Sequence, residues 1–186
     1  MQVEEVYALD SLQDLTLSNG ENYGLIFLFK WKEETDNRPI CVDANTEDLF
    51  FARQIVQNAC ATQAILGVLM NAEGLDIGEQ LGELKAFTYS LDPESKGLAI
   101  GNYDPVRIAH NEFARADPFV ADDDEDKKKR RSGETEDAYH FIAYVPFRGS
   151  VYELDGLKVR TVHIHFSIHV AVYASINAIF RRAAAY

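Results

Sequence analysis

The sequence predicts a single domain that contains both strands and helices, because strand patterns lie on both sides of a block of helical patterns. Short apolar runs of strand length occur early, at residues 3–9, 25–31 and 50–56. Helical patterns follow between residues 59 and 113, and a hairpin pattern covers residues 139–155. The length of 186 residues suits one domain with a sizeable core.

The composition limits the classes of function. A formal net charge of −12 disfavours a nucleic-acid surface, since phosphate contacts require clustered Lys and Arg. Two cysteines, Cys41 and Cys60, cannot build a disulfide framework, so a reducing compartment is the simpler interpretation. The acidic start MQVEEVYALD lacks the basic and apolar regions of a signal peptide. We therefore expect neither secretion nor a nucleic-acid partner.

The helical patterns differ in how deeply they should be buried. Residues 59–70 are apolar nearly all round, which predicts a buried helix. Asp76 and Glu79 indicate a capping box that opens a helix over residues 76–91. An Asp-Pro pair then opens another helix over residues 104–113, with apolar side chains on one face.

A highly charged segment, ADDDEDKKKRRSGETED, covers residues 121–137. It cannot bury enough apolar area to become ordered, so we predict a long, mobile loop. Its KKKRR run also fits a nuclear localisation signal, although a solvated loop whose charges largely cancel is the favoured interpretation.

The hairpin pattern fixes which residues share a face. Residues 139–146 and 151–155 alternate around a turn. A symmetric turn centred on Arg148 and Gly149 places Asp155 opposite Ile142 and on the same face as His140. The register therefore predicts that this carboxylate can orient this imidazole.

Cys60 has two interpretations. Near the start of the buried helix its sulfur would lie where unpaired N–H groups and the helix dipole favour a thiolate, the nucleophilic form. A free cysteine can equally be a small buried hydrophobe. His140 is the candidate base for a nucleophilic Cys60, and the Gln54 amide could donate to a developing oxyanion. His110 is a poorer candidate base because it shares a helix face with apolar neighbours.

Several motifs together resemble the ubiquitin carboxyl-terminal hydrolase family of cysteine peptidases. They are FFARQIVQNACATQAILGVLMN, EDAYHFIAYVP and YELDGL, in that order. VEEVYALD and GLIFLFKW also resemble early segments of the family's proteasome-associated branch. The similarity covers residues 2–157, and the motifs are highly specific in combination.

The resemblance implies an α+β domain with a papain-like fold, in which an antiparallel sheet is flanked by helices and the chain follows a knotted path. It implies that Cys60 is the nucleophile, His140 the general base and acid, Asp155 its orienter and Gln54 the oxyanion donor. It implies a thiol-dependent hydrolase that cleaves amide and isopeptide bonds after the C-terminal glycine of ubiquitin, without cofactor or metal. The expected partners are ubiquitin conjugates and the proteasome, in cytoplasm and nucleus. A crossover loop is expected at about residues 117–137.

The ends of the chain depart from the family pattern. The family normally has a further segment before VEEV and a different continuation after Leu157, and the proteasome-docking extension is absent. We therefore expect residues 1–157 to form a partial catalytic domain, incomplete at both ends, and residues 158–186 to form a divergent tail. An exposed sheet edge predicts low stability and low activity for this chain. The alternative function is a catalytically impaired ubiquitin-binding or regulatory fragment.

The tail raises two further alternatives. VHIHFSIHV, at residues 162–170, alternates strictly, so His163, His165 and His169 would share one strand face. Paired histidines can bind zinc, but no neighbouring Cys or carboxylate completes a ligand set, and we expect no metal. Residues 161–180 lack charged side chains, yet their polar residues disfavour a membrane span.

Overall fold

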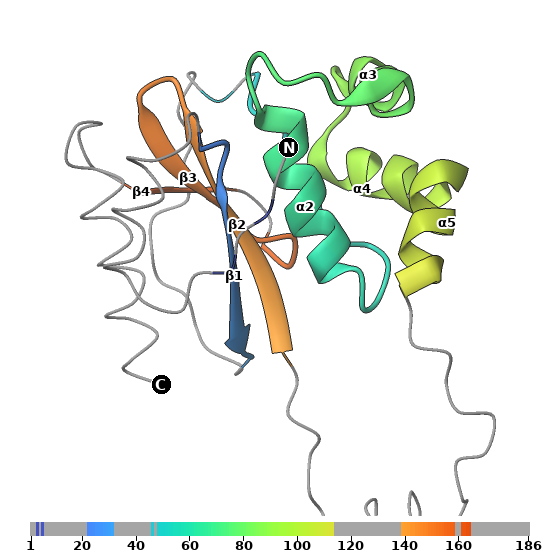
Figure 1. Cartoon of the computed structure of the whole chain (residues 1–186), viewed down its shortest axis with the longest axis horizontal. Coiled ribbons are helices and arrows are strands. Elements are labelled where there is room, and N and C mark those ends of the chain that lie inside the picture. The colour runs from blue at the N-terminus through green and yellow to red at the C-terminus, as the bar shows by residue number, and fades with distance from the viewer. Residues whose placement is uncertain are drawn as a thin grey trace, which may run out of the picture.

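A computed structural model describes residues 3, 5, 22–31, 46, 48–113, 139–158 and 161–164. Strands lie at both ends of this part of the chain, and helices lie between them (Figure 1). The elements are β1 (Leu25–Lys30), α2 (Cys60–Asn71), α3 (Gly78–Thr88), α4 (Pro93–Asn102), α5 (Asp104–Phe113), β2 (Tyr139–Phe147), β3 (Ser150–Leu154) and β4 (Val162–Ile164).

The strands form one antiparallel sheet in the order β1-β2-β3-β4. The predicted hairpin register is confirmed, since Tyr144 pairs with Glu153 and Ala143 with Leu154. The turn holds Arg148 at φ 43° and Gly149 at φ 85°. Two consecutive positive φ angles match the right-handed twist of the flanking strands, which is why so short a turn fixes the pairing.

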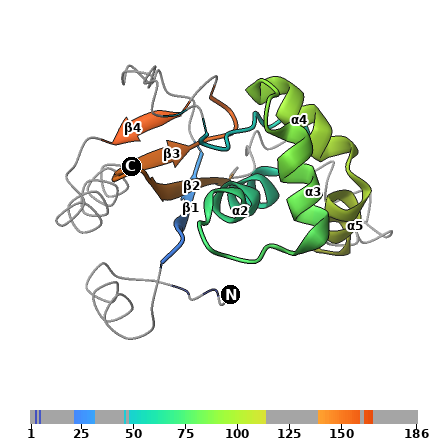
Figure 2. The same cartoon turned by 90° about the horizontal axis from the view of Figure 1, so that it is seen from above.

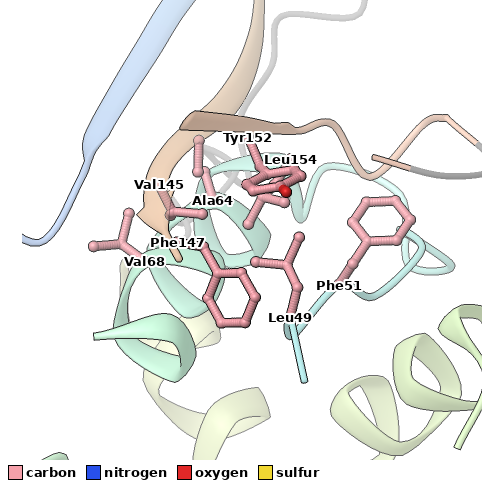
Figure 3. Close-up of a cluster of buried hydrophobic side chains, with 9 residues drawn as sticks. Leu49, Phe51, Ala64, Val68, Val145, Phe147, Tyr152 and Leu154 are labelled. Atoms are coloured by element: carbon pink, nitrogen blue, oxygen red, sulfur yellow. The ribbon is translucent and has the colours of Figure 1, made fainter. Parts of the chain in front are cut away.

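The helix α2 lies between the sheet and the other helices, as two perpendicular views show (Figures 1 and 2). Its interface with the sheet is the main core, in which Ala64 and Val68 pack against Val145 and Leu154 (Figure 3). The prediction of a buried helix over residues 59–70 is confirmed, and so is the α+β class. Burial of α2 on both sides explains why its sequence has no polar face.

The prediction of a strand at residues 50–56 is wrong. The segment has no regular secondary structure, and it pairs with none of the described strands. Its backbone groups bond instead to helices: Phe50 N donates to Asn71 Oδ1 at 2.8 Å, and Asn71 Nδ2 donates to Phe50 O at 2.9 Å. Arg53 N donates to Pro93 O at 2.8 Å. Buried backbone polar groups must be paired, and side-chain amides can replace a neighbouring strand.

The predicted helix over residues 76–91 is in fact shorter, and a further helix follows it. No side chain caps α3, whose N-cap is Ile77, and Asp76 Oδ1 accepts only from Gly78 N at 2.9 Å. Helical spacing places Phe87 on the same face as Leu84 and Leu91, yet its side chain is 69% exposed. The helix α4 was missed, although Asp92 followed by Pro93 is a helix-start signal of the kind used for α5.

Asp92 caps α4, and we expect Asp92→Ala to lower the melting temperature in a pH-dependent way. The Ser95 hydroxyl and backbone N–H groups hydrogen-bond the carboxylate and lower the pKa of Asp92 below its ordinary value of 3.8. The stabilisation is therefore complete above that ordinary value and is lost as pH falls through the lower, folded-state pKa. Calorimetric melting of both proteins across acidic pH measures this difference, and a constant difference would contradict it.

Several predictions fall outside the described residues. These are the strand at residues 3–9 apart from Val3 and Glu5, the loop at residues 117–137, and the tail beyond Ile164. Within the described part of the chain, none of the helices has the length and hydropathy needed to span a bilayer.

Candidate active site

Cys60 is the first residue of α2, as the position of its motif predicts. It follows a tight turn in which Asn58 has a positive φ of 59°. The N-cap residue, Ala59, makes no side-chain hydrogen bond, and the first turn contains no acidic residue. Free N–H groups and the positive end of the helix dipole therefore face this position and suit a negatively charged sulfur. The side chain is half-buried, so it is accessible to a substrate.

His140 and Asp155 form a buried pair. The ring Nε2 of His140 lies 2.8 Å from Asp155 Oδ1, and the two residues are 4% and 8% exposed. The hairpin register brings the end of β3 to the start of β2, which is how residues distant in sequence meet here. The Leu157 N–H donates to the same Oδ1 at 3.0 Å and fixes the carboxylate.

Two further contacts surround this pair. The Phe29 ring on β1 meets the His140 ring edge-on, with 5.6 Å between centroids and an interplanar angle of 82°. Lys158 Nζ lies 4.0 Å from Asp155 Oδ2 and 2.6 Å from Oε1 of the buried Glu153. The ring plane and the carboxylate are therefore held from several sides, a form of preorganisation that a general base requires.

Gln54 lies beside the loop that follows Asp155. Its backbone N–H donates to Gly156 O at 2.8 Å, which ties the Gln54 segment to that loop. Its side-chain Nε2 donates to Val56 O at 3.2 Å, and its buried Oε1 has no hydrogen-bond partner. An oxyanion could accept only from Nε2, so in the oxyanion role this amide nitrogen would turn from Val56 O toward the substrate.

The structure brings some of the predicted site residues together and leaves others apart. His140 and Asp155 are hydrogen-bonded, and Gln54 is bonded to the residue after Asp155. Among the described residues, the Cys60 sulfur forms no hydrogen bond with His140 or Gln54. Such bonds are often long in the absence of substrate.

Sequence reasoning missed two polar residues of α2 that hold the Gln54 segment. Gln63 Nε2 donates to Ala52 O at 2.8 Å, and Asn71 makes the paired bonds to Phe50 described above. Each is a polar side chain in a helix that is mostly apolar, and this feature of the sequence could have indicated a buried hydrogen bond. Thr62 connects α2 to a different element, because its hydroxyl lies 2.8 Å from Nδ1 of His110 on α5.

The described residues contain no cluster of His, Cys, Asp or Glu side chains with the geometry of a metal site. Of the tail histidines, only His163 lies in the described part of the chain, in β4. The expectation that the protein binds no metal stays a prediction.

The family model described as ubiquitin carboxyl-terminal hydrolase, family 1, matches residues 1–179. Ubiquitin carboxyl-terminal hydrolase isozyme L5 of Dictyostelium discoideum is 50% identical over 158 residues, which are 85% of this chain and 43% of that protein. Ubiquitin carboxyl-terminal hydrolase ubh-4 of Caenorhabditis elegans is 43% identical over 160 residues, covering 85% of this chain and 46% of that protein. The chain therefore spans about half the length of these curated relatives.

The fold is also similar to a solved structure. The crystal structure of the Trichinella spiralis UCH37 catalytic domain bound to ubiquitin vinyl methyl ester matches with a TM-score of 0.74 and 32% identity. The match covers 100% of this chain and 78% of that chain. This similarity confirms the fold that the sequence motifs predicted.

Proposed function

Because the chain belongs to the ubiquitin carboxyl-terminal hydrolase family, we propose that it is a thiol hydrolase that cleaves amide and isopeptide bonds after the C-terminal glycine of ubiquitin. The observation that carries the proposal is the buried hydrogen bond of 2.8 Å between His140 and Asp155. It joins residues of two separate family motifs, while the cysteine of the third motif begins a helix.

His140 has the geometry of a base held in one tautomer. The Asp155 carboxylate accepts a hydrogen bond, so the proton of the neutral ring resides on Nε2. The lone pair of Nδ1 is then free to accept the thiol proton of Cys60. Asp155 also stabilises the imidazolium that results, as the carboxylate does in other catalytic triads.

The reaction proceeds in two halves. The Cys60 sulfur attacks the carbonyl carbon of the last glycine, and the carbonyl oxygen becomes an oxyanion stabilised by Gln54 and a backbone N–H. His140 protonates the leaving amine as the C–N bond breaks, which leaves a thioester. Water, deprotonated by His140, then attacks the thioester, and its collapse releases the glycine carboxylate and restores the thiol.

The charge of the protein suits this substrate. The formal net charge of −12 would attract the basic C-terminal tail of ubiquitin and raise the rate of encounter. The motifs that resemble the proteasome-associated branch also support, as part of the proposal, association with the proteasome and residence in cytoplasm and nucleus. Fractionation of cells that express the chain would test both.

A ubiquitin derivative whose C-terminus carries a thiol-reactive electrophile tests the proposal directly. We expect the 186-residue chain to gain one ubiquitin, attached to Cys60 and not to Cys41, as measured by intact-mass and peptide-mapping mass spectrometry. A reactive probe accumulates product even when turnover is slow, so low activity does not obscure the result. Labelling at Cys41 would contradict the proposal. Ubiquitin binding without labelling would favour the alternative of a non-catalytic ubiquitin-binding fragment.

A further inference from the structure

Gln63 is a polar residue of α2 that lies close in sequence to the proposed nucleophile. It follows Cys60 by three residues, which places it on the same side of the helix about one turn later. Its Nε2 donates to Ala52 O at 2.8 Å, and Ala52 is only 4% exposed. Gln63 therefore links the nucleophile helix to the buried extended segment that leads to Gln54.

Gly156 meets both glutamines. A methyl group at Gly156 would lie 2.9 Å from Cβ of Gln54 and 3.2 Å from Cγ of Gln63. The carbonyl of Gly156 also accepts the hydrogen bond from Gln54 N at 2.8 Å. Because Gly156 directly follows Asp155, these contacts join the loop that carries the carboxylate to the segment that carries Gln54.

A small cavity lies where the Gln54 segment, α2 and the loop after Asp155 meet. It is lined by Phe50, Phe51, Ala52, Gln63, Gly67, Leu154 and Gly156, and its volume is about 10 Å³. That volume is at the lower limit for a single water molecule, so these side chains pack closely together. The contacts of Gln63 in the structure are with the protein itself, at Ala52 and Gly156.

We propose that Gln63 is a positioning residue that sets where Gln54 stands relative to Cys60. One side chain on the nucleophile helix fixes the Ala52 carbonyl, two residues before Gln54, and packs on Gly156. None of the described strands pairs with this segment. Its position depends on the side-chain bonds from Gln63 and Asn71 together with the backbone bonds of Arg53 N to Pro93 O and Gln54 N to Gly156 O. This inference rests on the proposed function, in which Gln54 stabilises the oxyanion.

The expected consequence is a loss of transition-state stabilisation. Without a donor, the buried Ala52 carbonyl must move to find another partner, and the segment moves with it. An oxyanion donor acts only within about 2.7–3.1 Å, and a displacement of about 1 Å can cost ~10²-fold in rate. We expect Gln63→Met, which keeps the volume but cannot donate, to lower kcat ~10- to 10²-fold with little change in KM.

The experiment measures hydrolysis of a ubiquitin C-terminal fluorogenic amide by the full chain. Thr62→Val is the matched control, because it removes a hydrogen bond of the same length from the adjacent residue of α2, directed at α5. We expect both variants to lose similar thermal stability, and only Gln63→Met to lose kcat. Equal kcat in Gln63→Met and the parent would overturn the inference.

Two further measurements separate positioning from a general defect. Alkylation of Cys60 by iodoacetamide forms no oxyanion, so its rate should stay within about twofold of the parent in Gln63→Met. In a Gln54→Ala background, Gln63→Met should add less than about a twofold further loss of kcat, because its partner is already absent. A slowed alkylation, or independent effects that multiply in the double variant, would overturn the inference.

Gly156→Ala provides a second approach if Gln63→Met does not fold. The added methyl group displaces Gln54 from the other side of the junction, and we expect it to lower kcat while iodoacetamide alkylation is unchanged. Failure of the proposed function is recognised separately, because the parent chain itself would then not react with the ubiquitin probe. A reactive parent with full activity in Gly156→Ala would overturn only the inference.

Discussion

Replacing Cys60 by serine should abolish turnover of ubiquitin amides. A hydroxyl group is far less acidic than a thiol, so the helix start and His140 cannot supply a comparable fraction of the anionic nucleophile. Removing the nucleophile of another hydrolase costs ~10⁶-fold in kcat, so we expect hydrolysis by Cys60→Ser to fall to the rate without enzyme. The rate is measured with a fluorogenic ubiquitin amide at saturating concentration.

Ubiquitin affinity should survive this change, because serine and cysteine differ little in size and Cys60 begins a helix that needs no thiol to form. Isothermal titration should give a Kd within about twofold of the parent. A mutation that removes an interaction made only in the transition state leaves the binding of ubiquitin in the ground state unchanged. Cys41→Ser is the matched control and should retain full activity. Turnover by Cys60→Ser, or its loss in Cys41→Ser, would mean that a different residue is the nucleophile.

Replacing Asp155 by asparagine should lower kcat by ~10³- to 10⁴-fold, by analogy with the loss seen when a triad carboxylate becomes an amide. The carboxylate accepts from His140 Nε2 and from Leu157 N, whereas an amide can turn its own donor toward the ring. The ring would then carry its proton on Nδ1 and could not accept one from Cys60. The imidazolium would also lose its counter-charge.

Tyr144→Phe is the matched control for this variant. Tyr144 lies on the same strand as His140, and its hydroxyl donates to Glu153 Oε2 at 2.9 Å in a buried position. We expect Tyr144→Phe to lower thermal stability and to change kcat by less than about threefold. If Asp155→Asn kept parental kcat, or if both variants lost kcat equally, His140 would be oriented by another group.

The pairing of His140 with Asp155 could be predicted from sequence because it depends on local geometry. A two-residue turn at Arg148 and Gly149 fixes the register of its own hairpin, and strand alternation then assigns each residue to a face. The α2 helix was predictable for a related reason, since an all-apolar segment of helical length has no stable place except the core.

The position of Gln54 could not be predicted in this way. The residues around it have the sequence pattern of a strand, and that local pattern cannot show that none of the described strands pairs with them. Side chains of α2 supply the hydrogen bonds instead, through Gln63 to Ala52 and through Asn71 to Phe50. Those partners are separated by 11 and 21 positions in the chain, and only the folded packing of helix on segment brings them together.

The sequence by itself determined the helix that begins at Cys60 and the shared face of His140 and Asp155, because each follows from periodicity or from a single turn. The α+β class was indicated by the resemblance of the motifs to a known family. The tertiary structure decided which distant groups contact these elements. The start of α4 accepts a hydrogen bond from the Gln54 segment, the Phe29 ring contacts the imidazole of His140, and Gln63 packs beside Gly156. The physical reason is that a pattern specifies which face of an element is buried, whereas hydrogen-bond partners and close approaches depend on which distant element covers that face.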